Sequence, residues 1–285
     1  MSDKDRGGPF PLPRGTAVIT GAGGALCGAM ARALGAIGVR IVALDLREDA
    51  ARATADAVIA AGGQGLAYGC SVLDEAGLSV VYGDVTARWG PPDYLVNGAG
   101  GNDPKASTDV EFLETSSAGW ERQLHFLNMD IDGFERALRL NFMGTVLPSK
   151  IFSRGMVEKG QGAIVNIASM SSVVPLTKIP AYSAGKAAVA NFTKWLAVHF
   201  SHTGVRVNAI APGFVMTEQL AFLHRDRATG EYTPRARRTI AHTPMGRYAE
   251  PEELVGTVIW LLSDASRFVT GDVIPIDGGF SSYTI

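Results

Sequence analysis

The length and the charge of the chain exclude several classes of protein. A chain of 285 residues, 46% of them hydrophobic, is long enough to bury the large core of one α/β domain. Its 26 basic residues nearly balance its 28 acidic ones, giving a formal net charge of -2, and no basic run predicts a surface for nucleic acid or anionic membrane. We therefore expect small-molecule ligands, with no nucleic-acid and no membrane partner.

Residues 1–14 are expected to precede the folded part as a mobile arm. The segment is polar and rich in Pro and Gly, without an apolar core of signal-peptide length, and no later apolar run is long enough to cross a bilayer. We therefore expect a cytoplasmic protein whose residues 15–285 form a single domain. Cys27 and Cys70 lack metal-ligand spacing, and we expect both to be buried, reduced thiols.

Short apolar segments alternate with longer amphipathic ones along the rest of the chain. The apolar segments predict buried parallel strands at 16–20, 40–45, 66–70, 94–100, 162–169 and 205–212. Helical patterns fill the intervals between them, for example at 28–38, 47–63 and 187–204. This alternation predicts right-handed βαβ units and therefore an α/β fold with a doubly wound, Rossmann-like parallel sheet.

Two long segments interrupt the alternation. Residues 101–131 form an irregular excursion after the fourth predicted strand, and residues 214–250 form a long polar stretch after the sixth. Loops of such length in a compact domain usually have a function. We expect residues 214–250 to form a lid over the substrate.

The first turn from strand to helix is rich in glycine. It reads TGAGGALCG from Thr20 to Gly28, and Gly21, Gly23 and Gly24 remove Cβ atoms where a pyrophosphate must come close. A tight turn also requires glycine for steric reasons alone, so this motif by itself fits both interpretations.

A carboxylate at the end of the second strand favours the cofactor interpretation. Asp45 lies 24 residues after Gly21, close to the spacing at which an acidic residue hydrogen-bonds the adenosine ribose. Its negative charge would repel a 2′-phosphate, which favours NAD over NADP as the cofactor. The alternative is that Asp45 is only the N-cap or a turn residue before the following helix.

A tyrosine and a lysine stand four residues apart in AYSAGK, residues 181–186. As a pair, Tyr182 and Lys186 are equally compatible with two ordinary polar residues on a helix face. Ser169 ends a predicted strand 13 residues before Tyr182, Asn141 lies in LNFMG within a long predicted helix, and PGFVMT (212–217) follows the sixth strand. Together with TGAGGALCG and NGAG, this set resembles the classical short-chain dehydrogenase/reductase family from about residue 14 to residue 280.

The resemblance implies a role for each of these four residues. Tyr182 would donate and accept the proton of the hydroxyl/carbonyl pair, while Lys186 would lower the pKa of Tyr182 and bind the nicotinamide ribose. Ser169 would hold the substrate oxygen, and Asn141 would anchor a water that links Lys186 to solvent. A cation one helical turn away favours the phenolate that a general base at neutral pH requires. The alternatives are an ordinary strand-end hydroxyl for Ser169 and a helix-interior amide bonded to a backbone carbonyl for Asn141.

The resemblance also implies the cofactor contacts, with departures from the family pattern. Gly98 replaces the usual second Asn of the NGAG motif, Ala25 and Cys27 replace glycines of the phosphate turn, and Ser71 replaces an Asp near the adenine. The residues expected to bind the cofactor are Gly21, Gly23, Gly24, Leu26, Asp45, Leu46, Ser71, Val72, Asn97, Gly98, Ala99, Tyr182, Lys186, Pro212, Gly213, Val215 and Thr217.

Longer motifs resemble one subgroup of this family, the enzymes assigned as D-mannonate (D-fructuronate) oxidoreductases. They are TGAGGALCGAMARALG, NGAGGNDPKAST, DIDGFERALRLNFMGTVLPSK and the final GDVIPIDGGFSSYTI. The resemblance implies NAD-linked interconversion of a secondary alcohol and a ketone on a sugar acid. Such a substrate requires a cation for its carboxylate and short polar groups for its hydroxyls.

The residues that we expect near the substrate are Asn102, Lys105 and Ser171. Lys105 fits equally well as a solvated loop lysine. The lid segment adds cations that would clamp a carboxylate, although each of them alone is better explained by solvent exposure. These cations are Arg225, Arg227, Arg235, Arg237 and Arg238. We expect His224 and His242 to be surface residues, and no ligand-spaced set of His, Asp and Glu predicts a metal.

Two other functions are compatible with the sequence. The first is a dehydrogenase of another polyol, hydroxy acid or bulkier alcohol, with the same cofactor and the same catalytic residues. The second is a dinucleotide-binding regulator without activity, which has no physical need for the four residues of the catalytic set. The family resemblance also implies a homotetramer in which helices at 132–158 and 181–203 pack across subunits.

Overall fold

A single parallel sheet organises the part of the chain that the computed structural model describes, which is residues 12, 14–116, 118–217, 220, 224–226 and 229–284. Seven strands lie in the order β3-β2-β1-β4-β5-β6-β7. Their bounds are β1 Thr16–Thr20, β2 Arg40–Asp45, β3 Gln64–Gly69, β4 Tyr94–Asn97, β5 Gly162–Ile167, β6 Val205–Pro212 and β7 Val273–Ile276. The chain order reverses at β1, which pairs with both β2 and β4.

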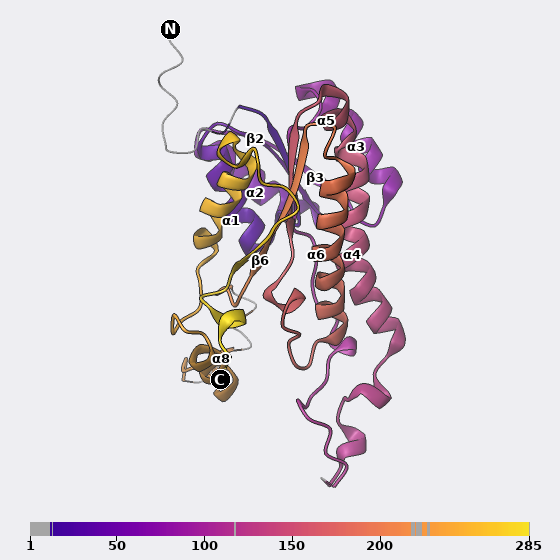
Figure 1. Cartoon of the computed structure of the whole chain (residues 1–285), viewed down its shortest axis with the longest axis vertical. Coiled ribbons are helices and arrows are strands. Elements are labelled where there is room, and N and C mark those ends of the chain that lie inside the picture. Colours follow the sequence, from indigo (N-terminus) through magenta and orange to yellow (C-terminus); the bar gives the residue numbers. More distant parts are fainter. Residues whose placement is uncertain are drawn as a thin grey trace.

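Helices cover both faces of this sheet (Figure 1). Apolar side chains of α1, α2 and α9 share one hydrophobic cluster with the sheet, and those of α3, α4, α5 and α6 share another. The described helices are α1 Ala25–Ala36, α2 Glu48–Ala60, α3 Glu75–Trp89, α4 Ile131–Phe152, α5 Arg154–Lys159, α6 Pro180–His199, α8 Pro234–His242 and α9 Val255–Leu262. Because both faces are covered, the central strands are buried almost throughout, as their continuous apolar runs predict.

The predicted fold class is confirmed, and most predicted strand bounds agree with the structure. Strands β1, β2 and β6 have the predicted bounds, whereas β4 and β5 end earlier than predicted. The strand β4 ends because the next two N–H groups, of Gly98 and Ala99, donate to the Thr20 side-chain hydroxyl instead of to a neighbouring strand. The prediction missed β7, a short edge strand that contains Pro275, a residue tolerated where no further strand must be paired.

The two segments that break the alternation both lie beyond the carboxyl ends of the strands. Residues 101–130 contain three short 3-10 turns and project from the body below α4 and α6 (Figure 1). The segment 214–250 contains α8, and part of it, including Arg227, lies outside the described residues. Most of the predicted N-terminal arm also lies outside them. No helix in the described ranges has the length and apolar character needed to span a membrane.

Candidate active site

A cleft of about 790 Å³ opens where the strand order reverses, at the carboxyl ends of β1 and β4. This is the position at which doubly wound folds bind their ligands. Many residues predicted to bind the cofactor line the cleft. They are Gly21, Gly23, Gly24, Leu26, Asp45, Gly98, Ala99, Tyr182, Lys186 and Thr217.

The glycine-rich turn forms one wall of the cleft, and its glycines are required by close approach. Gly21 has a φ of +67°, and a Cβ there would lie 2.9 Å from the Ala99 backbone. A Cβ on Gly23 would lie 2.4 Å from the Cβ of Ala50. Helix α1 begins directly after Gly24, which supplies no side-chain cap, so N–H groups of its first turn are available to an anion. These donors fit the pyrophosphate of a dinucleotide.

Asp45 braces this turn and lines the cleft. One carboxylate oxygen accepts a hydrogen bond from the Gly23 N–H (3.0 Å), and the other accepts one from the Arg47 N–H (3.0 Å). The N-cap of α2 is Arg47, so Asp45 is not the cap of this helix, but its bond to the Arg47 N–H two residues on is the turn contact that the same alternative predicted. The remaining lone pairs of the carboxylate can accept ribose hydroxyls.

The two departures at Cys27 and Gly98 are connected in the structure. Cys27 is 4% exposed, and a Cβ built on Gly98 would lie 2.1 Å from its sulfur. The thiol therefore occupies the volume that a side chain at position 98 would need. Burial raises the pKa of Cys27 to about 12, so the sulfur stays protonated and acts as a packing group. Both predicted free cysteines are unpaired, and Cys70 is only half-buried.

Ser169, Tyr182 and Lys186 lie together at the ends of β5 and on the first two turns of α6. The Tyr182 hydroxyl is hydrogen-bonded to Ser169. The Lys186 Nζ lies 5.7 Å from the centre of the Tyr182 ring and donates to the Ile167 carbonyl at 2.7 Å. Ser169 in turn accepts from the Ser171 N–H at 3.2 Å, which fixes its hydroxyl at the start of a 3-10 turn.

Burial controls the ionisation of Tyr182 and Lys186. Burial raises the pKa of Tyr182, and the hydrogen bond with Ser169 opposes that change. Burial also lowers the pKa of Lys186 to about 8. The lowering predicted from Lys186 therefore does not set the direction of the shift, because removing a phenolate from water costs more than the neighbouring groups return.

Asn141 connects α4 to the segment after β4. Its Nδ2 donates to the carbonyls of Gly101 (2.6 Å) and Ala137 (2.8 Å), and its Oδ1 accepts from the Gly101 N–H (3.2 Å). The bond to the Ala137 carbonyl is the one expected of a helix-interior amide, which was the alternative interpretation of Asn141. The two bonds with the Gly101 backbone are additional. A Cβ on Gly100 would lie 2.7 Å from Asn141 Oδ1 and 3.3 Å from Lys186 Nζ. Asn141 therefore holds the backbone that passes beside Lys186.

A second cavity, of about 320 Å³, adjoins the first at Tyr182 and Thr217. Ser169, Asn102 and the Tyr182 ring are polar or amphipathic parts of its wall, and most of the rest is apolar. The apolar residues include Leu26, Ile167, Met170, Leu176, Ile179, Phe214 and Leu220. The described lining contains no Lys, Arg, Asp, Glu or His. This cavity is the candidate substrate pocket because it contains the hydroxyls of Ser169 and Tyr182.

The structure separates the three residues predicted near the substrate. Asn102 lines the candidate pocket and donates to the Ser107 hydroxyl at 2.7 Å. Lys105 lines neither cavity. Its Nζ lies 3.6 Å from Asp130 and forms an ion pair with it, so the structure does not place Lys105 near the substrate. The Ser171 hydroxyl is buried without a partner in the described part of the chain, and Ser171 does not line the candidate pocket.

Most described arginines of the lid already have partners. Arg225 lies over the Tyr232 ring, Arg237 pairs with Glu231, and Arg238 pairs with Glu111. Arg235 is exposed on α8 and has no hydrogen bond or ion pair within the described residues.

The two lid histidines differ in exposure. His242 is exposed, as predicted. The prediction of a surface position is wrong for His224, which is 1% exposed, because its Nδ1 is hydrogen-bonded to the Tyr248 hydroxyl (2.7 Å) and its ring packs near Phe214. Burial lowers the pKa of His224, so the ring is neutral at pH 7.

Several residues predicted to bind the cofactor do not line the cleft. They are Leu46, Ser71, Val72 and Asn97. Asn97 points into the sheet, where its Nδ2 donates to Ser149 and Asn166, both at 2.9 Å, and Val72 packs in the core. The residues Pro212, Gly213 and Val215 line the substrate cavity instead.

Other residues of the cleft were missed by sequence reasoning. They are Ala25, Cys27, Arg47, Gly100, Gly101 and Ile167. For Arg47 the sequence did contain a signal, because it lies two residues after Asp45, which was itself predicted to bind the cofactor. The described residues contain no group of three or more His, Cys, Asp or Glu side chains arranged to hold a metal ion.

Comparison with known proteins gives the same assignment for most of the chain. The model of the short chain dehydrogenase family matches residues 15–228. The uncharacterized oxidoreductase UxuB of Bacillus subtilis is 44% identical over 94% of this chain and 95% of its own length. Cis-4-hydroxycyclohexanecarboxylate dehydrogenase of Sinomonas cyclohexanicum is 35% identical over 93% of this chain and 96% of its own.

A crystal structure extends the comparison to three dimensions. It shows a protein from Haemophilus influenzae, provisionally assigned as a D-mannonate oxidoreductase, with bound NAD. The two structures superpose with a TM-score of 0.90 at 44% identity, over 94% of this chain and 95% of the other. The chain therefore belongs to the short-chain dehydrogenase family, and it is an oxidoreductase of that family.

Proposed function

We propose that the protein is an NAD-dependent oxidoreductase that interconverts a secondary alcohol and a ketone on a sugar acid such as D-mannonate or D-fructuronate. The observation that carries the substrate class is the likeness to the Haemophilus protein with bound NAD, at 44% identity over nearly the full length of both chains. The cofactor is NAD, and Asp45 supports this choice because its carboxylate at the cleft would repel the 2′-phosphate of NADP.

The cleft residues would bind the two halves of the cofactor. The first turn of α1 and the glycines before it would hold the pyrophosphate, and Asp45 would accept the ribose hydroxyls. Lys186 and Thr217 line the end of the cleft that meets the substrate cavity. When bound there, the nicotinamide accepts or supplies the hydride.

Tyr182 and Ser169 would carry the acid/base part of the reaction. In alcohol oxidation the Tyr182 oxygen takes the substrate hydroxyl proton, and in ketone reduction it returns that proton. The Ser169 hydroxyl, held by the Ser171 N–H, donates to the substrate oxygen as negative charge develops on it. Because burial disfavours the phenolate, the ammonium of Lys186, whose Nζ lies 5.7 Å from the centre of the Tyr182 ring, would favour it in the opposite direction.

Lys186 would also relay the proton away from Tyr182. Its pKa of about 8 allows it to gain or lose a proton near neutral pH, and the Ile167 carbonyl holds its Nζ in place. Asn141 keeps Gly100 and Gly101 beside this lysine. We propose that its side chain acts by holding this backbone rather than by binding a water directly, since its amide groups already have backbone partners.

The carboxylate of a sugar acid would be recognised from the lid. The described pocket lining has no cation. Among the described arginines of the predicted lid, Arg235 is the one without a hydrogen bond or ion pair to another described residue. Its guanidinium is close enough to His224 and Tyr248 to influence their pKa values, and both of these residues pack against Phe214 of the pocket wall. We propose that Arg235 binds the substrate carboxylate.

The apolar wall favours one second candidate, the oxidation of a bulkier hydroxy acid. Leu26, Met170, Leu176 and Ile179 offer few partners for several sugar hydroxyls. The relative from Sinomonas that acts on cis-4-hydroxycyclohexanecarboxylate is 35% identical. A carbocyclic hydroxy acid would place its ring against this wall and its carboxylate toward the lid.

An absorbance assay at the reduced-nicotinamide wavelength tests these substrates. NAD and NADP are each combined with D-mannonate, other aldonates, cis-4-hydroxycyclohexanecarboxylate and neutral secondary alcohols. We expect NAD-linked turnover of D-mannonate. Turnover of the carbocyclic acid alone would select the second candidate, and turnover of neutral alcohols with no preference for a carboxylate would contradict both.

We also propose that the chain assembles as a homotetramer. Large apolar side chains are exposed on α6, where Trp195 is 57% and Val198 is 74% exposed, and before β7, where Phe268 is fully exposed. Apolar surface on two separate elements is typical of a protein with two kinds of subunit interface. Light scattering after size exclusion measures the mass. A monomeric mass at micromolar concentration would contradict the proposal.

A further inference from the structure

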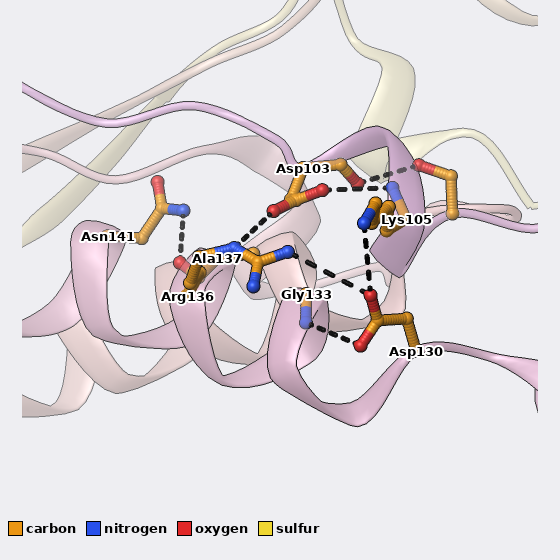
Figure 2. A network of polar contacts seen from close by, with 8 residues as sticks. Asp103, Lys105, Asp130, Gly133, Arg136, Ala137 and Asn141 are labelled. Carbon is orange, nitrogen blue, oxygen red and sulfur yellow. Dashed lines mark hydrogen bonds and ion pairs between the residues drawn. The ribbon is translucent and has the colours of Figure 1, made fainter.

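The segment that follows β4 runs back along the first turns of α4. Polar contacts join the two elements at successive positions, and Figure 2 shows those made by Asp103 and Lys105. The three contacts are Gly101 with Asn141, Asp103 with Arg136, and Lys105 with Asp130. Alternate residues of the segment therefore contact α4 in descending order along the helix, and we call this arrangement the 101–105 ladder.

The central contact of the ladder is an ion pair with a fixed geometry. Arg136 Nε donates to Asp103 Oδ2 at 3.0 Å, while the other carboxylate oxygen accepts from the Lys105 N–H at 2.9 Å. The Asp103 side chain is 20% exposed. The Lys105 N–H and Arg136 hold the pKa of Asp103 below its usual range, so the pair is charged at neutral pH.

Asp130 places a second carboxylate beside the same arginine. It caps α4 by accepting from the Gly133 N–H at 3.2 Å, and its Oδ2 lies 4.0 Å from Arg136 Nη2. Arg136 thus contacts the carboxylates of the segment and of the helix start (Figure 2). The backbone of the segment also packs closely on the helix, because a Cβ on Gly133 would lie 2.8 Å from the Cβ of Lys105.

The residue between the first two contacts of the ladder faces the substrate cavity. Successive side chains of an extended chain point in opposite directions, and Asp103 has extended backbone angles (φ −100°, ψ 124°). Gly101 and Asp103 are held against α4, and Asn102 lines the candidate substrate pocket together with Gly101. The direction of Asn102 therefore depends on the contacts on both sides of it and on its own bond to the Ser107 hydroxyl, which in turn donates to the Asp103 carbonyl at 3.3 Å.

We propose that Asp103 and Arg136 are positioning residues of this oxidoreductase. Their ion pair fixes the path of residues 101–103, and thereby holds Asn102 and the Gly101 backbone at the substrate cavity. Neither charged side chain lines that cavity. The proposal rests on the oxidoreductase activity of the proposed function and not on the sugar-acid class, since any substrate in the pocket would meet Asn102.

Kinetics of Arg136→Met test the proposal, with D-mannonate and NAD as the probes. We expect KM for D-mannonate to rise about tenfold with a smaller change in kcat, because a misplaced positioning group weakens substrate binding. The dissociation constant of NAD should stay within about twofold. Arg136→Lys keeps a cation beside Asp103 and should restore most of the loss. Arg139→Met is the matched control, an exposed arginine on the same helix that makes no hydrogen bond or ion pair to the described residues of the segment.

A second variant and a second measurement separate positioning from folding. Asp103→Asn keeps an acceptor for the Lys105 N–H but removes the charge, and it should raise KM as Arg136→Met does. Amide hydrogen exchange should become faster in residues 100–107 in both variants and stay unchanged in the sheet. An unchanged KM in Arg136→Met, an equal rise in Arg139→Met, or exchange that rises over the whole molecule would each overturn the proposal.

Failure of the proposed substrate gives a different result. If the wild-type protein does not oxidise D-mannonate, the sugar-acid assignment is wrong, and the same variants are compared with the alcohol that the wild-type protein does oxidise. A rise of KM for that alcohol in Arg136→Met and in Asp103→Asn, with rescue in Arg136→Lys, would still support the positioning role.

Discussion

Tyr182 sits in an environment that disfavours its own reactive form. Burial raises the pKa of the phenol, and the same burial lowers the pKa of Lys186 to about 8. Burial thus shifts both the phenol and the amine toward their neutral forms, and in the proposed mechanism the proton passes between these two groups. Ser169 is hydrogen-bonded to the phenol, and the Ile167 carbonyl accepts from Lys186 Nζ. The Tyr182 oxygen and the Lys186 nitrogen are therefore held in place before the substrate binds.

Replacing Tyr182 by Phe removes only the hydroxyl of this site. We expect kcat to fall at least about a thousandfold, because the acid/base group is lost, while the affinity for NAD changes by less than about threefold. Steady-state kinetics and fluorescence titration with NADH measure the two quantities. Preserved turnover would contradict the assigned role of Tyr182.

The contact between Cys27 and Gly98 predicts a compensating pair. Gly98→Ala places a Cβ against the Cys27 sulfur and should cost about 1–3 kcal/mol of stability, with weaker NAD binding. Cys27→Ala opens the volume, so the double variant should recover most of the loss. Chemical denaturation and NAD titration of both single variants and the double variant give the coupling. Additive losses would show that the two positions are independent.

Among the elements, α8 and the excursion after β4 are joined by an ion pair. Arg238 of α8 pairs through two nitrogens with both carboxylate oxygens of Glu111, at 3.1 and 3.3 Å. The Lys178 Nζ donates to the Asp109 carbonyl of the same excursion at 2.6 Å. The excursion therefore connects the lid to the segment that leads into α6.

Breaking the pair between Glu111 and Arg238 should loosen the lid rather than the fold. Because Arg238 is largely exposed, the pair is worth about 0.2–1 kcal/mol, and Arg238→Gln should raise KM by no more than about fivefold. Arg237→Gln is the matched control, since the partner of Arg237, Glu231, lies within the lid itself. A higher salt concentration should also raise the KM of the wild-type protein, because salt screens this exposed ion pair. Equal KM values for the two variants would remove the lid role of this pair.

At the scale of the whole molecule, helices on both faces of the sheet exclude water from the interior. Burying the charged Lys186 there costs free energy of folding. The lysine is 4% exposed, and its folded-state pKa of about 8 lies below its ordinary value of 10.5. Between these values the unfolded chain binds more protons than the folded chain, so the contribution of Lys186 to the free energy of unfolding rises with pH. Below pH 8 both states are protonated and the burial cost is present in full.

Lys186→Met should therefore abolish turnover and stabilise the fold. We expect a higher Tm than that of the wild-type protein at pH 7, and the difference should shrink as the pH rises from 8 toward 10. Thermal unfolding of both proteins across this range is the measurement. A lower Tm at pH 7 would show that the bond of Lys186 to the Ile167 carbonyl outweighs its burial cost.

The sequence by itself determined the fold class, because apolar periodicity is a local property of the chain, and its motif spacing singled out the four residues of the proposed catalytic set. It also indicated Asp45, whose carboxylate does line the cleft. It failed at Asn97, His224 and Lys105, since the sequence does not distinguish a polar side chain that bonds within the protein from one that faces a ligand or solvent.

Only the tertiary structure decided which distant residues meet. The partners Asp103 and Arg136 lie 33 positions apart in the chain, and Glu111 and Arg238 lie 127 apart. It also decided the burial that moves the pKa values of Tyr182 and Lys186. The physical reason is that solvent exclusion and long-range pairing depend on how the helices and loops pack over the sheet, which local patterns do not specify.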